Sequence, residues 1–429
     1  MASFVFETGN QTQASGLISG DTLVFQTDTP TQLTVTQGSA QFGVDTITLN
    51  DGTQNLTFSQ SALAGATKSF FNAGNGVLAI GTSGADTTAL NVANTVSGDS
   101  AIYGFGGNDT FTVQGSGNNL IHGGADNDNI TYSGTGLTSI YGDAGTDTID
   151  ASTATKALFL NGGADADTIT GGTGNDHIYG NVAGSQQGDA DGIDNINGGA
   201  GSDYINGNAG ADIINGGTGS DRILGGNGGD SIVGGDGNDT VNGNLGDDSI
   251  AGNANDDYLR GGQGADTIDG GAGNDIIKGD LGTDTITGGG GYDVLEGGGD
   301  ADRFVFSATD AGDASHFALT NGAYSTGATT VSDVITDFTH GTDKIDLAFT
   351  GTIAVAYQAD GSSYSTMAAA QAAAAGILAG TTNTVAAINV GSDTYLFFDG
   401  DGSSGTLDSV VKLLGVNASV TTLTGSDFV

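Results

Sequence analysis

A nine-residue unit repeats twelve times without a break in register between Gly198 and Val305, and it constrains the fold more than any other feature. The first unit reads GGAGSDYIN, and later units read GGDGNDTVN, GGQGADTID and GGAGNDIIK. Every unit has Asp at its sixth position and an apolar residue at its eighth. Self-similarity at a short fixed period indicates stacked units that pack on their neighbours. The sequence therefore predicts a solenoid.

The residue types within one unit indicate what each part does. Glycines at positions one, two and four allow left-handed backbone angles in a tight turn whose carbonyls point inward. The Asp adds a carboxylate oxygen, and ligation by oxygen alone suits a hard cation such as calcium. The last three residues are extended, with the apolar side chain inward. Two units make one coil of about eighteen residues, so each cation would lie between unit n and unit n+2.

This consensus, G-G-x-G-x-D-x-U-x with U apolar, resembles the calcium-binding nonapeptide of RTX proteins. The resemblance implies an all-β fold, a parallel β-roll or β-helix stacked on calcium, with roughly ten or more Ca²⁺ ions bound. It also implies that the sixth-position side chains are ligands: Asp203, Asp212, Asp221, Asp230, Asp239, Asp248, Asp257, Asp266, Asp275, Asp284, Asp293 and Asp302.

Five turns in this stretch depart from the consensus because Asn or Asp replaces a glycine, at six positions in all. The replacements are Asn208, Asn244, Asn253 and Asp280 at the second position, and Asn255 and Asp300 at the fourth. Asn and Asp tolerate left-handed backbone angles better than other non-glycine residues. We therefore expect these turns to keep their shape, with weaker cation sites.

A less regular repeat precedes the regular one, over residues 81–197. Its Asp-bearing turns start at Gly104, Gly123, Gly142 and Gly162, at spacings of 19, 19 and 20 residues. Full-coil spacing predicts a parallel β-helix with one glycine turn per coil and an ordinary turn on its other side. The nine-residue rhythm begins at Gly171 and is interrupted by a loop before it resumes. The predicted metal ligands of this stretch are Asp109, Asp128, Asp147, Asp167, Asp176 and Asp194.

The charge balance limits the partners of the chain and suggests a folding switch. Eight Lys and Arg residues stand against 50 Asp and Glu residues, for a net charge of −42 among 429 residues. Such a charge disfavours nucleic acid as a partner. Without a cation the carboxylates repel each other and the glycines lose much backbone entropy on folding, so we expect a disordered metal-free repeat. Calcium would fold it outside the cell.

The two ends of the chain differ from the repeat. Residues 1–80 predict a small N-terminal β domain or cap with strands at 22–25, 32–36, 45–49 and 55–58, and a hairpin turn at Asp51-Gly52. The start of the chain has no pattern of a signal peptide, and no stretch reaches transmembrane length.

Residues 198–306 predict the regular roll, and residues 307–429 predict a β-rich C-terminal cap with a helix from Thr366 to Leu378 that ends at Gly380. The β segments of this cap resemble the C-terminal region of secreted RTX proteases and lipases. That resemblance implies an uncleaved signal for a type I secretion machinery, and the last four residues, 426–429, match its ending of an acid followed by apolar residues.

Motifs for catalysis are absent from the sequence. None of the four histidines, His122, His177, His316 and His340, is followed by Glu, so no HExxH zinc helix exists. No serine has glycine at both flanking positions of a G-x-S-x-G elbow. We therefore expect that the protein is not an enzyme.

The sequence favours a secreted structural protein of a Gram-negative bacterium, located outside the cell or on its surface. It would fold on calcium and self-associate into a surface layer, a filament or a biofilm matrix, with a cell-surface polysaccharide as a further candidate partner. One alternative is an adhesin that binds a glycan or a surface through residues 1–80. A second alternative is a secreted hydrolase whose site the motifs do not reveal.

Overall fold

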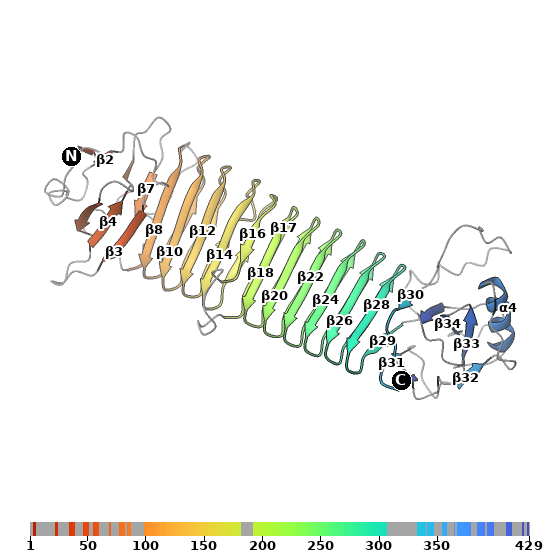
Figure 1. Cartoon of the computed structure of the whole chain (residues 1–429). Helices are drawn as coiled ribbons and strands as arrows, with labels where there is room; N and C mark the ends of the chain where they lie inside the picture. Colours follow the sequence, from red (N-terminus) through yellow and green to blue (C-terminus); the bar gives the residue numbers. More distant parts are fainter. Residues whose placement is uncertain are drawn as a thin grey trace. The chain divides into compact units, whose positions relative to one another are not determined.

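A computed structural model gives the fold of the protein, and it divides the chain into two compact units, Met1–Thr218 and Gly219–Val429 (Figure 1). The structure describes residues 77–81, 84–86, 98–181, 192–306, 333–339 and 341–346. It also describes the shorter segments 3–5, 22–24, 34–38, 46–50, 55–59, 68–69, 354–357, 364, 367–378, 384–390, 393–398, 409–413, 423 and 427–428. The predicted boundaries after residues 80, 197 and 306 stay predictions.

Unit 1 contains a solenoid with two parallel sheets. One sheet comprises β8 Ser100–Gly106, β10 Asn119–Ala125, β12 Thr138–Ala144, β14 Leu158–Ala164, β16 His177–Tyr179 and β18 Tyr204–Ala209. The other comprises β9 Thr110–Val113, β11 Asn129–Tyr132, β13 Thr148–Asp150, β15 Thr168–Thr170, β17 Asn195–Ala200 and β19 Ile213–Thr218. Neighbouring strands pair without a slip, so that Ile121 lies opposite Ile102 and Ile140.

Unit 2 repeats this arrangement with shorter coils. Its first sheet comprises β20 Arg222–Asn227, β22 Thr240–Leu245, β24 Tyr258–Gln263, β26 Ile276–Leu281, β28 Val294–Gly299 and β30 Asp333–Ile335. Its second comprises β21 Ser231–Asp236, β23 Ser249–Ala254, β25 Thr267–Ala272, β27 Thr285–Gly290, β29 Arg303–Val305 and β31 Lys344–Asp346.

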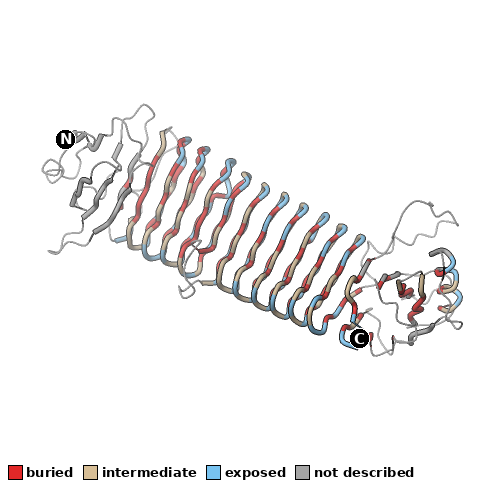
Figure 2. The backbone as a smooth tube through the Cα atoms, viewed as in Figure 1, coloured by how far each residue is buried: buried red, intermediate tan, exposed pale blue. Residues whose placement is uncertain are grey.

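The core of each solenoid is a stack of the eighth-position side chains. Every one is at most 2 % exposed: Ile205, Ile214, Ile223, Ile232, Val241, Ile250, Leu259, Ile268, Ile277, Ile286, Leu295 and Phe304. Their neighbours in the strands are more exposed, so burial alternates along each strand (Figure 2). Full burial of each such side chain stabilises the fold by about 1.5–3 kcal/mol. The predicted all-β parallel roll is confirmed.

The described residues before the solenoid form the strands β1 Ser3–Val5, β2 Thr22–Val24, β3 Thr34–Gly38, β4 Thr46–Asn50, β5 Asn55–Ser59, β6 Lys68–Ser69 and β7 Val77–Ile80. Strands β4 and β5 pair antiparallel with Asn50 opposite Asn55, as a hairpin requires. The predicted turn at Asp51-Gly52 lies outside the described residues.

The C-terminal part adds β32 Ala354–Tyr357, α4 Met367–Leu378, β33 Thr384–Val390, β34 Asp393–Phe398 and β35 Ser409–Leu413. Strands β33, β34 and β35 pair antiparallel. Helix α4 begins one residue after the predicted start, and it packs Ala370 and Ala374 against Ile388 and Phe397. None of the helical segments that the structure describes has the length and apolar character to cross a membrane.

Candidate metal sites

The sixth-position aspartates form columns that connect successive coils. In each step the backbone N–H of one Asp donates to Oδ1 of the Asp one coil later, as from Asp128 to Asp147 at 2.7 Å and from Asp257 to Asp275 at 2.8 Å. In unit 1 a column runs through Asp109, Asp128, Asp147, Asp167, Asp194 and Asp212, and a second contains Asp176 and Asp203. In unit 2 the columns run through Asp221, Asp239, Asp257, Asp275 and Asp293, and through Asp230, Asp248, Asp266, Asp284 and Asp302.

The second carboxylate oxygen of these residues is buried. Within the described part of the chain it accepts no hydrogen bond at nine of them: Asp109, Asp128, Asp147, Asp239, Asp248, Asp257, Asp266, Asp275 and Asp284. A buried carboxylate oxygen without a partner is costly, because it has lost water and gained nothing in return. Nine such atoms at equivalent positions indicate that the fold provides for a positive partner there.

In several turns, among them those of Gly234, Gly252 and Gly279, the first glycine lies next to both Oδ2 of the Asp and a carbonyl oxygen of the next coil. A Cβ at Gly234 would lie 2.6 Å from Oδ2 of Asp239 and 3.0 Å from the carbonyl oxygen of Gly252 in the next coil. Only glycine leaves this space open. Carboxylate and carbonyl oxygens from two stacked turns are the donor set that calcium prefers. The residues present therefore fit the calcium ion that the repeat implies.

The turns keep their shape where the consensus glycine is replaced. Gly235 and Gly237 have φ of 121° and 138°, in the region that only glycine adopts easily. Asn244 and Asp280 occupy the second position with φ of 78° and 76°. The left-handed conformation that the sequence predicts for these substituted turns is thus present.

Burial shifts the acidity of the columns. Burial, with a smaller contribution from neighbouring aspartates, raises the pKa of Asp147 from 3.8 to about 7 and that of Asp239 to about 6. Backbone N–H donors to the carboxylates act in the opposite direction. Burial is also the main cause that raises the pKa values of Asp109 and Asp284 to about 7. Protons and a cation therefore compete for these oxygens near neutral pH.

The sites differ from those built by side chains alone. Among the described residues, no three His, Cys, Asp or Glu side chains converge on one point. A cation bound at these columns would instead take carboxylate oxygens from the columns and its other donors from backbone carbonyls. This composition excludes, for the described part of the chain, a side-chain cluster of the kind that holds zinc.

One predicted ligand differs from the others. Both oxygens of Asp176 already accept hydrogen bonds, from Leu158 N–H at 2.8 Å and from Gly172 N–H at 2.8 Å. The turn that contains it has a complete consensus, GGTGND. Asp176 is buried like the rest, but backbone N–H groups satisfy its charge.

Sequence reasoning missed the residues that continue the columns in unit 2. Asp333 and Asp343 accept the backbone N–H of Asp293 and Asp302, both at 3.1 Å, 40 and 41 residues away in sequence. Asp343 also accepts the N–H of Thr339 at 2.6 Å. The signal that could have found them is the short pattern of Asp, any residue and an apolar residue, in DVI at 333–335 and DKI at 343–345.

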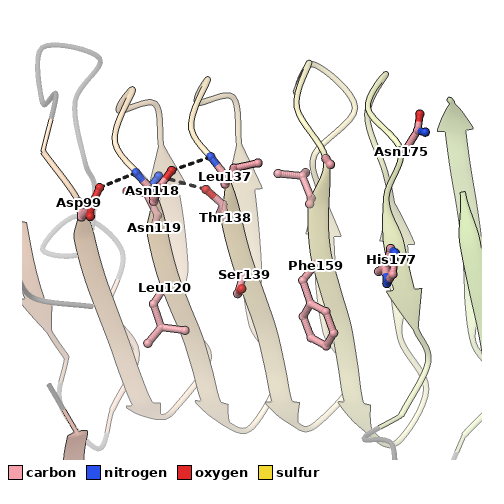
Figure 3. A pocket seen from close by; sticks show the side chains of 12 residues that line it. Asp99, Asn118, Asn119, Leu120, Leu137, Thr138, Ser139, Phe159, Asn175 and His177 are labelled. Carbon is pink, nitrogen blue, oxygen red and sulfur yellow. Dashed lines mark hydrogen bonds between the residues drawn. The ribbon is translucent and has the colours of Figure 1, made fainter. Parts of the chain in front are cut away.

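A second ladder lies on the ordinary turns of unit 1 (Figure 3). Asn118 N–H donates to Asp99 Oδ1 at 2.9 Å, and Leu137 N–H donates to Asn118 Oδ1 at 3.0 Å. Like the aspartate columns, the ladder connects successive coils, but here each N–H donates to a side chain one coil earlier, and the turns are not of the nonapeptide type. It ends at Leu137, whose side chain is 58 % exposed. These turns are therefore held by amide and carboxylate side chains.

Two of the four histidines lie in the described solenoid, on strands of unit 1. His122 stacks between Tyr103 and Tyr141, with ring centroids 5.3 and 4.6 Å away, and its Nδ1 lies 2.9 Å from Asp143 Oδ2. His177 is exposed beside Tyr204. His316 and His340 lie outside the described residues. The contacts of His122 and His177 belong to an aromatic row on the outer face of the sheet.

Parallel coils, glycine turns and aspartate columns define the class of calcium-stacked β-rolls. The family model of the RTX calcium-binding nonapeptide repeat matches residues 91–113, 115–134, 132–153, 159–182, 190–223, 215–250, 224–259, 251–286 and 278–308. The chain belongs to the RTX repeat family, whose repeats bind calcium.

Similarity to individual proteins is limited. A search of curated proteins finds no match. Among solved structures 32 chains match. One is the solution structure of the AlgE6R3 subunit from the Azotobacter vinelandii mannuronan C5-epimerase, with 28 % identity over 42 % of this chain and 80 % of that chain, at a TM-score of 0.26.

Proposed function

We propose that the protein is a calcium-dependent structural protein that is exported, folds outside the cell and assembles on a bacterial surface as a layer, filament or matrix. The observation that carries this proposal is the set of buried aspartate columns, in which nine Oδ2 atoms accept no hydrogen bond within the described part of the chain. These columns run along both solenoids. The largest regular part of the chain is therefore built around cation binding.

The proposed ligands are Oδ2 atoms of the columns and carbonyl oxygens of the facing turns. In unit 2, Asp239 and the carbonyl of Gly252 would hold one ion between them, and Asp257 with Gly270 repeats the arrangement one coil later. A bound calcium ion supplies positive charge and connects adjacent coils. The aspartate side chains orient the turns, because Oδ1 is already fixed by a backbone N–H. We assign Asp176 a capping role, since backbone donors satisfy both of its oxygens.

Charge supports a coupling between calcium and folding. The chain carries −42, and many of its acids are buried next to each other in the columns. Metal-free coils would hold carboxylates without compensation at neutral pH. At a free calcium level ten times the dissociation constant, each occupied site adds about 1.4 kcal/mol of stability. Extracellular calcium modules bind at about 10⁻⁴–10⁻³ M, so the protein would fold after export by the type I machinery.

Assembly follows from the same electrostatics. Copies with a charge of −42 repel one another unless cations lower the effective charge. Calcium that fills the columns would reduce this repulsion and stiffen the coils at once. Electron microscopy of the purified full chain with millimolar calcium and with chelator tests the proposal. Ordered arrays that form with calcium and disperse with chelator are expected, whereas dispersed particles in both conditions would refute assembly.

A further inference from the structure

Strands β24, β26 and β28 of unit 2 are neighbours in one sheet (Figure 1). Exposed apolar side chains form a row on the outer face of this sheet. Ile276 and Val294 lie opposite each other in register and are 42 % and 39 % exposed. Tyr258 lies opposite Ile276 on the other side. On the second sheet of unit 2, the described residues of β21, β23, β25 and β27 include no exposed large hydrophobic side chain. Adjoining exposed apolar side chains of this kind mark an association surface.

The next row on the same face carries both signs of charge. Arg260 lies opposite Lys278, and Lys278 lies opposite Glu296. Lys278 pairs with Glu296, and Arg260 pairs with Asp280 at 2.7 Å. Two bases and two acids therefore balance here, in a chain that has 50 acids and eight bases. Most of the acidic surface repels a second copy, but this face does not.

We propose that this face associates with the same face of a second copy. We call it the β26–β28 face, and it comprises Tyr258, Arg260, Ile276, Lys278, Val294 and Glu296. The two-fold axis would run parallel to the strands, between β26 and β28. The inference rests on the proposed assembly and names a surface for it.

This axis makes the face complementary to itself. It reverses the order of the strands, so that β26 faces the partner copy's β28. Ile276 then lies over the partner's Val294, and Lys278 lies over the partner's Glu296. A two-fold contact makes each of these pairings twice. The Lys278–Glu296 pairs of the two copies together form a cluster of four alternating charges, which lies beside the covered apolar row.

The charge pattern favours a second copy over other occupants. A partner with a uniform charge of either sign would leave Arg260 and Lys278, or Asp280 and Glu296, facing like charge. A purely apolar partner would cover the ion pairs without replacing their water. A copy of the same face places Lys278 over Glu296 and Ile276 over Val294.

The test uses the full chain in millimolar calcium and sedimentation velocity over a range of concentrations. Lys278→Glu places four acids at the centre of the contact, and Glu296→Lys places four bases there. We expect each variant alone to raise the dissociation constant for self-association at least ~10-fold, because like charges at an interface are strongly unfavourable. An equal mixture of the two variants should regain association near the wild-type level. Two misfolded variants would not regain association when they are mixed, so such a recovery would show that the charges act at the contact.

A second pair of variants tests the apolar row. Val294→Lys should weaken self-association, whereas Ile213→Lys should not, although Ile213 on β19 is 52 % exposed. Wild-type association in both single charge variants, or no recovery in their mixture, overturns the β26–β28 face and leaves assembly standing. A wild-type chain that stays monomeric at every concentration in calcium overturns both.

Discussion

The backbone N–H of Asp257 donates to Oδ1 of Asp275, eighteen residues later, at 2.8 Å, while Oδ2 of Asp275 is buried without a hydrogen bond from the described residues. One oxygen therefore joins the coils, and the other is the proposed ligand of a cation. The step repeats along both solenoids, so fold and metal binding depend on the same side chain. The charge that would oppose folding at neutral pH is the charge that calcium needs.

Replacing a column aspartate should remove calcium and stability together. We expect Asp239→Asn to lower the number of bound calcium ions by at least one and to raise the calcium concentration at the folding midpoint. The lost stability should be about 1.4 kcal/mol at a calcium level ten times the dissociation constant. Isothermal titration calorimetry and circular dichroism measure the two effects. Asp236→Asn is the matched control in the same repeat, because Asp236 is exposed; an equal loss in both variants would contradict the assignment.

Asp176 should behave differently from Asp147, although both are the sixth residue of an Asp-bearing turn. Asp176→Asn places an amide N–H group against a backbone donor and removes a hydrogen bond, which costs about 1–3 kcal/mol at any calcium concentration. The calcium count should not change. Asp147→Asn should lower the calcium count, since its Oδ2 accepts no hydrogen bond within the described residues. Equilibrium dialysis with calcium distinguishes the two, and a lost ion in the Asp176 variant would argue against its capping role.

Two glycine substitutions should act in opposite directions. Gly234→Ala places a methyl group 2.6 Å from Oδ2 of Asp239, so it should destabilise the roll and weaken its calcium binding. Gly376→Ala fills open space on helix α4 and should raise stability by about 0.5–1 kcal/mol without any change in calcium binding. Thermal unfolding in calcium measures both. Normal calcium affinity in the Gly234 variant would contradict the proposed position of the ion.

Proton binding should replace calcium in part at low pH. Burial raises the pKa of column aspartates to about 6 or 7 in the folded chain, above the ordinary 3.8. A group with a raised folded pKa stabilises the fold below its unfolded pKa, and this contribution is lost as the pH rises through 6 to 7. In chelator, β content should therefore increase as the pH falls from 8 to 4.

With calcium present, the same drop in pH should raise the calcium midpoint, because protons occupy the sites. Circular dichroism at several pH values measures both effects. A calcium midpoint that does not vary between pH 5 and pH 8 would show that the columns are not the binding sites.

The nine-residue period predicted the coil, its core and the aspartate columns because each depends on local spacing. Asp333 and Asp343 could not be found in this way, since a long segment separates them from the repeat and breaks its count. The hydrogen bond from Gly172 N–H to Asp176 Oδ2 could not be found from the sequence either, because the turn GGTGND fits the same consensus as the other Asp-bearing turns. The ladder at Asp99 and Asn118 lies on turns that lack the nonapeptide pattern, so the nine-residue period does not reveal it.

The most direct test of the account is a calcium titration of the full chain at pH 8, followed by far-ultraviolet circular dichroism with a parallel count of bound calcium. The account predicts a largely disordered chain in chelator. It also predicts a cooperative gain of β structure near millimolar calcium, with roughly ten or more ions bound at the end. A repeat region that is already folded in chelator at this pH, or that folds without binding calcium, would contradict it.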